Sequence, residues 1–321
     1  MSTAPPILIG ETPRSGSHAL GHLIASSSRY HVLPEEVVFH ANDGGLVGYL
    51  NGSLTRDELV DALRGEWWNR PAPWDRRETF GLRTMIDPDD LEAAIAEFRS
   101  SDDPAAAGRA LVMRMLDPLA ARAGKPGWVE HTPNNIGASA TLGRFFPDAK
   151  FIHIVRDGRD RACSVVRLPW GPSTVEEAIS AWAWKLRADE HQARALAPGR
   201  MLVVQLEDLV LVDRERTFQR LLEFLELDEE ASMREFFDRD VTPERAHVGR
   251  WRSEIAEPER SRIERLYTDT LARLREAGVS CAPVDHGIDV SYARAEAEPP
   301  NPYDTWSSGA YAPLGEELSG R

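Results

Sequence analysis

The chain has 321 residues, of which 42% are hydrophobic and 28% charged, which is enough apolar material to bury the core of one large domain. The net charge of −14 and a pI of about 5.2 argue against a nucleic-acid-binding protein, because such proteins present a basic face. The only lysines are Lys125, Lys150 and Lys185, so any anion site must be built mainly from arginine.

Cysteine content and hydropathy narrow the class of protein further. Cys163 and Cys281 are too few for a disulfide framework, and we expect both to be reduced thiols. The sequence has no N-terminal apolar leader and no run of about 18 apolar residues. We therefore expect a cytoplasmic protein without a membrane span; its oligomeric state has no signal in the sequence.

The first predicted elements are a buried strand over residues 6–10 and a helix over about 15–26. A turn with Gly and Ser at a helix N-terminus offers free backbone N–H groups and the positive end of the helix dipole, which together bind phosphate. Arg14 would add a cation, and Ser15 and Ser17 would add hydroxyls. The lysine of a Walker A loop is missing, and the turn alone fits an ordinary strand–turn–helix corner equally well.

Two carboxylates, Glu35 and Glu36, precede an apolar strand-like run that ends at His40. Neighbouring side chains of a strand point to opposite faces, so one carboxylate should point inward and the other outward. A solvated acidic turn is the alternative.

Residues 44 to about 127 are predicted to form a helical insertion. Thr55 and Glu58 have the spacing of a capping box. The aromatic cluster in this insertion fits either core packing or an acceptor pocket, and consists of Trp67, Trp68 and Trp74.

A second strand is predicted over residues 150–155, and it ends in a charged turn that starts with Arg156. Ser164 lies about two turns into the following helix, so its hydroxyl and the Arg156 guanidinium could converge on one phosphate above the sheet edge. A salt-bridged surface turn is the alternative. Further on, Ser173 and Glu176 have the spacing of a capping box.

A third strand is predicted over residues 201–206, and strands that alternate with helices indicate a parallel sheet covered on both faces. We predict an α/β fold with one domain over residues 1–282. The segment 283–321 is rich in Pro, Gly, Ser and Glu and is predicted to be a loosely ordered tail.

Five segments together resemble the sulfotransferases that use 3′-phosphoadenosine 5′-phosphosulfate, and they occur in that family's order. They are Pro13-Arg14-Ser15-Gly16-Ser17, Glu130-His131-Thr132-Pro133-Asn134, Arg156-Asp157-Gly158-Arg159-Asp160 with Ser164, Gln205-Leu206-Glu207-Asp208-Leu209, and Val248-Gly249-Arg250-Trp251-Arg252. The Pro-Arg-Ser-Gly sequence is similar to that of the carbohydrate and tyrosyl-protein branch and its bacterial relatives. The resemblance ends at about residue 255.

The resemblance implies a P-loop-like three-layer α/β/α fold and transfer of a sulfuryl group to a hydroxyl or amine, with 3′-phosphoadenosine 5′-phosphate as the other product. It implies no metal site. We expect the acceptor pocket beneath the insertion, where aromatic faces suit a small molecule, a carbohydrate or a lipid alike. The cofactor-binding residues that the resemblance implies are Arg14, Ser15, Gly16, Ser17, His18, Arg156, Ser164, Gly249 and Arg250.

The catalytic residues that the resemblance implies are a general base and cations beside the leaving group. The carbohydrate and tyrosyl-protein branch has a catalytic glutamate about twenty residues after the phosphate loop. Glu36, 22 residues after Arg14, is therefore the first candidate for the base, Glu35 is the second and His40 is the third. Arg14 and His131 are the expected cations, although His131 stands where the family usually has lysine. Leu206 replaces a tyrosine often found against the adenine.

Two alternatives from other classes stay open on the sequence alone. A P-loop nucleotide kinase or hydrolase would need the missing Walker lysine and a magnesium-binding aspartate. A non-catalytic nucleotide-binding protein on the same fold would bind the nucleotide without turnover.

Overall fold

A five-stranded parallel sheet forms the centre of the molecule. The computed structural model of the chain describes residues 4–71 and 79–292. The strand order is β2-β5-β1-β6-β7, and every neighbouring pair is parallel. The strands are β1 (Ile7–Glu11), β2 (Tyr30–Val32), β5 (Gly127–Glu130), β6 (Lys150–Val155) and β7 (Met201–Gln205). This is the α/β architecture that the sequence predicts.

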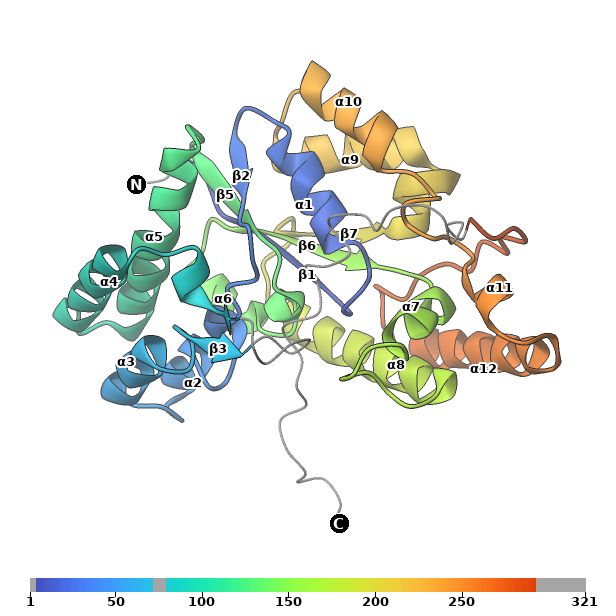
Figure 1. The fold of residues 1–321 in the computed structure, drawn as a ribbon, viewed down its shortest axis with the longest axis horizontal. Helices are drawn as coiled ribbons and strands as arrows, with labels where there is room; N and C mark the ends of the chain where they lie inside the picture. Colours follow the sequence, from blue (N-terminus) through green and yellow to red (C-terminus); the bar gives the residue numbers. More distant parts are fainter. Residues whose placement is uncertain (1–3, 72–78, 293–321) are drawn as a thin grey trace, which may run out of the picture.

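Helices cover both faces of this sheet, which is why most side chains of its strands are apolar. Ile7 and Ile9 of β1 pack in one cluster with side chains of α1, α9 and α10, whereas Leu8 between them packs in a separate cluster on the other face. Figure 1 shows α1, α9 and α10 on one side of the sheet and α6, α7, α8 and α12 on the other. The helices of the first side are α1 (Ser17–Ala25), α9 (Arg214–Leu225) and α10 (Ala231–Asp240).

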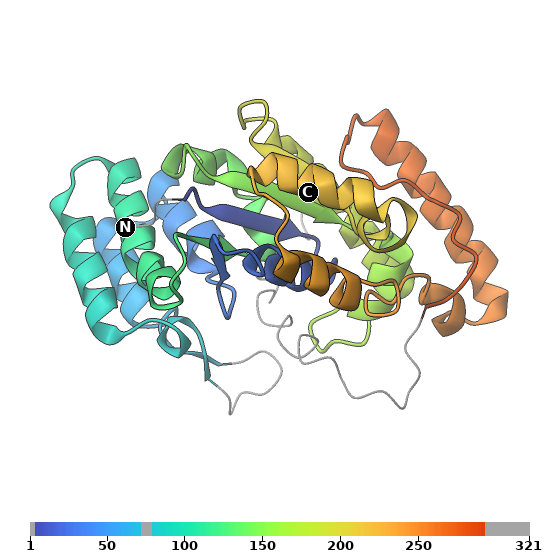
Figure 2. The same cartoon turned by 90° about the horizontal axis from the view of Figure 1, so that it is seen from above.

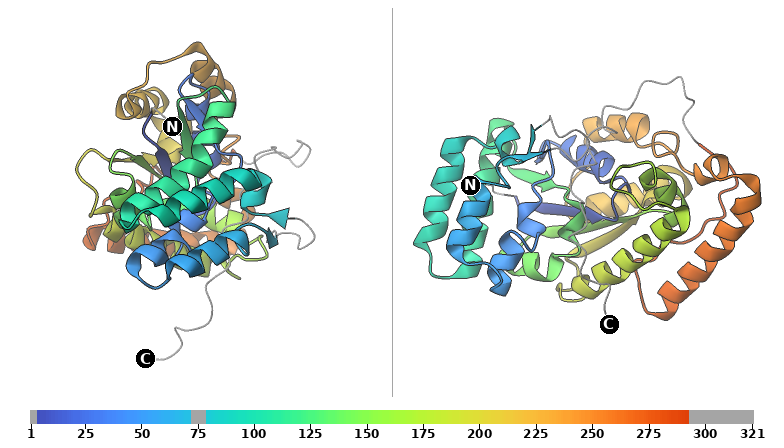
Figure 3. Two further views of the ribbon diagram at one scale, coloured as in Figure 1. Left: turned by 90° about the vertical axis from the view of Figure 1, so that its left-hand side faces the viewer. Right: turned by 60° about the horizontal axis from the view of Figure 1, so that its bottom comes forward.

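The helices on the second side pack against one another, and α8 and α12 also pack against the carboxyl end of β6. Val155 at the end of β6 shares a cluster with Trp182 of α8 and Tyr267 of α12, and Figure 3 shows α8 and α12 side by side. These helices are α6 (Ser139–Phe145), α7 (Gly158–Val165), α8 (Val175–Ala193), α11 (Trp251–Glu254) and α12 (Glu257–Glu276).

The predicted insertion forms a helical layer at one end of the sheet, as Figure 2 shows. Its helices bury Leu91, Ile95 and Phe98 in one cluster with Phe145 and Phe146 from the α6 region. A short antiparallel pair, β3 (Arg70–Pro71) and β4 (Thr79–Phe80), interrupts it. The helices are α2 (Leu46–Asn51), α3 (Arg56–Arg64), α4 (Pro88–Ser100) and α5 (Pro104–Arg122).

Short helical turns complete the connections. They are the 3₁₀ turns η1 (Phe39–Ala41), η2 (Leu82–Thr84) and η3 (Pro133–Asn135), and the π-helical turn η4 (Asp208–Val212). The predicted strand-like run after Glu36 is therefore wrong: residues 35–38 form a loop and η1 follows. The reason is that its backbone groups bond to side chains, with the Val37 N–H donating to Glu130 and the Val38 N–H to Thr132.

The last described segment, residues 284–292, returns along the domain after α12. Val284 exchanges two hydrogen bonds of 2.8 Å with the Gln205 side chain, and the Tyr292 N–H donates to the Val248 carbonyl at 2.8 Å. Asp285 forms an ion pair with Arg159 at 3.0 Å. The start of the predicted tail thus lies against the carboxyl end of the sheet.

Among the described residues, no helix is both long enough and apolar enough to cross a membrane.

Candidate functional site

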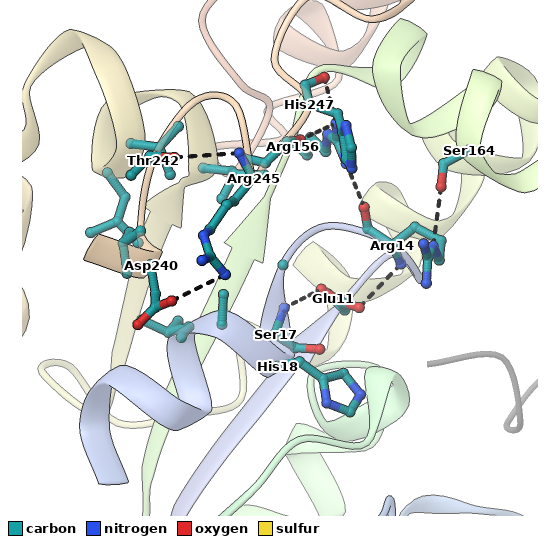
Figure 4. Close-up of a pocket in the computed structure, with 18 of the residues that line it drawn as sticks. Glu11, Arg14, Ser17, His18, Arg156, Ser164, Asp240, Thr242, Arg245 and His247 are labelled. Carbon is teal, nitrogen blue, oxygen red and sulfur yellow. Dashed lines mark hydrogen bonds and ion pairs between the residues drawn. The ribbon is translucent and has the colours of Figure 1, made fainter. Parts of the chain in front are cut away.

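A cavity opens at the carboxyl ends of β1 and β6, where the chain leaves these neighbouring strands in opposite directions. From β1 it passes to β2 at one edge of the sheet, and from β6 to β7 at the other. Such a switch point is where open α/β sheets bind ligands. Figure 4 shows side chains from the loop after β1, from α7 and from the segment after α10 around the cavity.

Four arginines line this cavity, against two carboxylates, although the whole chain is strongly acidic. The arginines are Arg14, Arg156, Arg245 and Arg250, and the carboxylates are Glu11 and Asp240. Arg245 is in an ion pair with Asp240 at 3.1 Å, and Arg250 with Glu254 at 2.8 Å. The lining is therefore suited to an anion, which is what the sequence predicts for this loop.

The loop between β1 and α1 is held from inside by a buried carboxylate. Glu11 at the end of β1 accepts hydrogen bonds from the backbone N–H groups of Arg14 (3.2 Å), Ser15 (3.1 Å) and Ser17 (2.9 Å). Burial raises the pKa of Glu11, and these N–H groups and the Arg14 charge oppose the rise. The donors that the sequence assigns to a phosphate are thus already bonded to an anion, and the sequence gives no sign of this role for Glu11.

Backbone strain marks the same loop. Arg14 has a φ of 78° and Gly16 a φ of 106°, both in the left-handed region, which is costly for a residue with a side chain. A Cβ at Gly16 would also lie 3.1 Å from a methyl of Leu206. Such strain is retained where the surroundings enforce it, as in ligand-binding loops.

Arg14 and Ser164 meet across the cavity. The Arg14 Nε–H donates to the Ser164 hydroxyl at 3.1 Å, so the first and second predicted anchors belong to one site. Ser17 and His18 also line the cavity. Ser15 does not: its buried hydroxyl donates to the Thr12 carbonyl at 2.6 Å, which corrects the expectation that it faces a phosphate.

Arg156 lines the cavity while tying its walls together. Its guanidinium donates to the backbone carbonyls of Arg14 (3.1 Å), Ala246 (2.7 Å) and His247 (3.1 Å). Its Nε–H is buried without a hydrogen-bond partner among the described residues. Arg156 is thus both a structural cross-link and a source of an unused donor.

Of the late segment that the sequence selects, Arg250 lines the cavity and Gly249 does not. The Gly249 N–H donates to Asp160 at 2.7 Å, and a Cβ there would lie 2.1 Å from the Val290 carbonyl oxygen. Arg245, which sequence reasoning missed, lies three residues before the segment of resemblance.

Behind the loop, three of the predicted residues approach one another. His18, Glu36 and His131 each offer a ligand atom, and these atoms lie within 4.8 Å of one another. Glu36 is only 5% exposed, and its Oε2 has no partner among the described residues. Burial, with the charges of Glu130 and Glu11, raises the pKa of Glu36 well above 4.5.

His131 is 1% exposed, and its Nε2 lies 3.1 Å from the Leu33 carbonyl. Burial lowers the pKa of His131 below 6.5, although the Glu130 charge opposes this shift. Its imidazole is thus largely neutral at neutral pH, which argues against the expected standing cation. Nor does His131 line the cavity.

Glu130 and His40 form a separate buried pair. Burial raises the pKa of Glu130, but the His40 charge and several hydrogen bonds outweigh it and bring the pKa to about 2. His40 Nε2 lies 2.7 Å from the Asn135 amide oxygen and 3.3 Å from Glu130. This pairing favours a structural role for His40, the third candidate base.

Glu35 points away from this group. It is half-buried and accepts a hydrogen bond of 2.8 Å from the Thr84 hydroxyl in η2. Among the predicted aromatic cluster, Trp67 is buried and donates to the Gly44 carbonyl at 3.0 Å, Trp68 is half-buried, and Trp74 lies outside the described residues.

Comparison with known proteins identifies a family. A model described as the sulfotransferase family matches residues 5–231. No curated protein sequence matches significantly. Similar solved structures include the sulfotransferase domain of the Synechococcus PCC 7002 olefin synthase, at 19% identity over 80% of this chain and 90% of that chain, with a TM-score of 0.49. A sulfotransferase from Alicyclobacillus acidocaldarius is 13% identical over 86% of this chain and 96% of that chain, with a TM-score of 0.44. A mouse sulfotransferase complexed with PAP is 12% identical over 86% of this chain and 88% of that chain, with a TM-score of 0.45.

Proposed function

Because this chain belongs to the sulfotransferase family, we propose that it transfers a sulfuryl group from 3′-phosphoadenosine 5′-phosphosulfate to a hydroxyl or amine. The proposed acceptor is a small molecule, a carbohydrate or a lipid. Family membership favours this function over a nucleotide kinase or hydrolase.

The observation that carries the proposal is that both predicted phosphate anchors line one cavity. Arg14 of the loop after β1 and Ser164 of α7 are hydrogen-bonded to each other, and Arg156 lies on the same cavity. A nucleotide with phosphates at two ends needs two such anion sites a short distance apart. Leu206, Phe236 and other apolar side chains of the cavity offer a surface for a base.

In this proposal, residues of the loop bind the 5′ end of the donor and residues of α7 bind the 3′-phosphate. The Arg14 guanidinium and the Ser17 hydroxyl hold the 5′ end. Arg156, Ser164 and Arg250 hold the 3′-phosphate. When bound, the donor supplies the sulfuryl group and a phosphate leaving group.

Glu36 is the proposed general base. An acceptor must lose a proton as it attacks, and efficient bases have a pKa raised toward the working pH. Burial does this for Glu36, and its Oε2 is not committed to another group among the described residues. Glu35 is the weaker candidate because its carboxylate is bonded to Thr84.

Charge stabilisation at the leaving oxygen is assigned to Arg14. Sulfuryl transfer, like phosphoryl transfer, depends on positioning and on charges that are in place before the reaction. Arg14 is the permanent cation of the loop. His131, which is neutral and buried behind His18, is assigned a positioning role.

A thermal-shift comparison tests the proposed function. 3′-Phosphoadenosine 5′-phosphate should raise the melting temperature more than ATP or 5′-AMP at equal concentration, because a ligand of the native state stabilises it. An equal response to all three, or a response only to ATP with magnesium, would contradict the proposal.

The 3′-phosphate assignment is tested by Arg156→Ala. Loss of a charge-assisted phosphate contact should lower the affinity for 3′-phosphoadenosine 5′-phosphate by about tenfold to a hundredfold. The affinity for 5′-AMP should hardly change. Ser164→Ala is the matched control and should lose less, because its hydrogen bond is neutral. Since Arg156 also bonds three backbone carbonyls, its variant must be compared at a temperature where it is folded. Equal calorimetric losses for both nucleotides would remove the assignment.

A further inference from the structure

Three ligand atoms converge behind the phosphate loop from separate parts of the chain. His18 lies in the first turn of α1, Glu36 in the loop before η1, and His131 directly after β5. Their ligand atoms lie within 4.8 Å of one another. Among the described residues, three buried atoms of this cluster have no hydrogen-bond partner: His18 Nε2, Glu36 Oε2 and His131 Nδ1.

Buried polar atoms are nearly always partnered, so three such atoms in one cluster need an explanation. Two imidazole nitrogens and one carboxylate oxygen are a ligand set that suits Zn²⁺, which leaves a fourth position open in many enzymes. Mg²⁺ and Ca²⁺ prefer oxygen ligands and fit this set poorly.

The surroundings favour a metal cation at this point. His131 Nε2 lies 3.1 Å from the Leu33 carbonyl, and an N–H there leaves Nδ1 with its lone pair. Metal-binding histidines commonly have such an outer hydrogen bond, which fixes the tautomer. The charges of the carboxylates Glu130, Glu11 and Glu35 act on Glu36, and the charge of Arg70 opposes them.

We propose that His18, Glu36 and His131 form a binding site for Zn²⁺ or a similar divalent transition-metal ion, with an open position beside the nucleotide cavity that His18 lines. Bonds of about 2.1 Å place tetrahedral ligands roughly 3.4 Å apart, so small side-chain rotations close the cluster around the ion. The sequence predicts no metal here because its ligands are separated by 18 and 95 residues along the chain.

The ion would bind the carboxylate that we assign as the general base, so Zn²⁺ inhibits sulfuryl transfer. This consequence rests on the proposed function, whereas metal binding does not. The site is therefore tested first without any nucleotide or acceptor.

The experiment is a titration of chelator-treated, full-length protein with Co²⁺, followed by visible absorption, and with Zn²⁺, followed by calorimetry. We expect one ion per chain, a Co²⁺ spectrum typical of four or five ligands, and its loss when Zn²⁺ is added. Each of three ligand variants should lower the affinity for Zn²⁺ by at least about tenfold to a hundredfold: His18→Ala, Glu36→Gln and His131→Gln. His191→Ala, which removes an exposed imidazole of α8, is the matched control and should bind like the wild type.

Wild-type protein that binds no Co²⁺ or Zn²⁺ would overturn the proposal, whatever the variants do. So would binding that all three ligand variants retain. Glu36→Gln nearly preserves shape, and its circular dichroism and melting curve show whether it is folded. Metal binding without a thermal shift by 3′-phosphoadenosine 5′-phosphate would support this site and contradict the proposed function. A thermal shift by the nucleotide without metal binding would support the proposed function and contradict this site.

Discussion

Two buried carboxylates near the loop between β1 and α1 differ in their hydrogen bonding. Glu11 is bonded to three backbone N–H groups of the loop. Glu36 has an oxygen without a partner among the described residues. The first is thus suited to hold the loop, and the second to accept a proton.

Glu36→Gln keeps the shape of the side chain but removes its ability to accept a proton. Turnover should fall by about 10²–10⁴, the usual contribution of a general base. In the wild type, turnover should also fall as the pH drops below the raised pKa of Glu36, because the protonated carboxyl is no base; the variant should lack this limb. Steady-state rates across pH check both points.

Glu35→Gln is the control for this change and should keep near-normal turnover, because Glu35 points to Thr84. If only the Glu35 variant is inactive, the role belongs to Glu35. If both variants stay active, neither is the base.

Glu11→Gln tests the carboxylate inside the loop. The Glu11 charge opposes an anion that needs the same N–H groups, so the neutral variant should bind 3′-phosphoadenosine 5′-phosphate more tightly. A charge at about 4 Å is worth roughly 1 kcal/mol even in water, which corresponds to about fivefold. Calorimetry at neutral pH measures the change. Weaker binding by a folded variant would mean that Glu11 organises the loop for the nucleotide and does not compete with it.

The sequence indicates which residue types gather in the site but not how each side chain is directed. Arg14, Arg156 and Ser164 line one cavity as expected. Ser15 turns inward because its hydroxyl has a nearer partner in Thr12, and burial keeps His131 neutral. The burial of His131 depends on neighbours from distant segments, which local patterns do not contain.

At the scale of elements, long apolar runs were predictable and short strands were not. The strands predicted over residues 6–10, 150–155 and 201–206 correspond to β1, β6 and β7. Sequence reasoning missed β2 and β5, because three and four residues give no periodic signal. Their place in the sheet comes from pairing: β5 pairs with β1, and β2 pairs with β5.

The N-terminus of helix α8 shows how accurately residue spacing locates a helix cap. The sequence predicts a capping box at Ser173 and Glu176, which is wrong by one residue. In the structure, the Thr174 side chain accepts a hydrogen bond from the Glu177 N–H, and the Glu177 carboxylate accepts one from the Thr174 N–H. Both pairs have the same spacing, so only the backbone conformation distinguishes them. The box at Thr55 and Glu58 is confirmed.

Thr174→Ala should therefore destabilise the protein by about 1 kcal/mol, the usual value for an N-cap. Ser173→Ala is the matched control and should change the free energy of unfolding little. Denaturant unfolding of the two variants measures both values. A larger loss in the Ser173 variant would return the cap to the predicted position.

At the scale of the whole molecule, stability should depend on a carboxyl buried between β7 and α7. Glu207 accepts a hydrogen bond from the Asp157 N–H at 2.9 Å, and its Oε2 has no partner in the described part of the chain. Burial, with the Asp157 charge, raises the pKa of Glu207 to about 7. The folded state therefore binds this proton more tightly than the unfolded chain does.

The stability that Glu207 contributes is complete below pH 4.5 and is lost as the pH rises to about 7, because the native state binds more protons over this interval. Glu207→Gln, which cannot ionise, should gain stability relative to the wild type across the same range. The gain is at most about 3 kcal/mol for a shift of this size. Unfolding curves of both proteins at pH 5 and pH 7.5 test this, and a difference that does not change with pH would contradict it.

The return of residues 284–292 to the sheet has a consequence for how the protein is made. Tyr292 and Val290 contact Val248 and Gly249, next to the cavity-lining residues His247 and Arg250. A chain emerging from the ribosome can form the sheet and its helices while this last segment is still inside the tunnel. The wall of the cavity gains these contacts only after residue 292 has left the tunnel, so a nascent chain can form the sheet before this wall is complete.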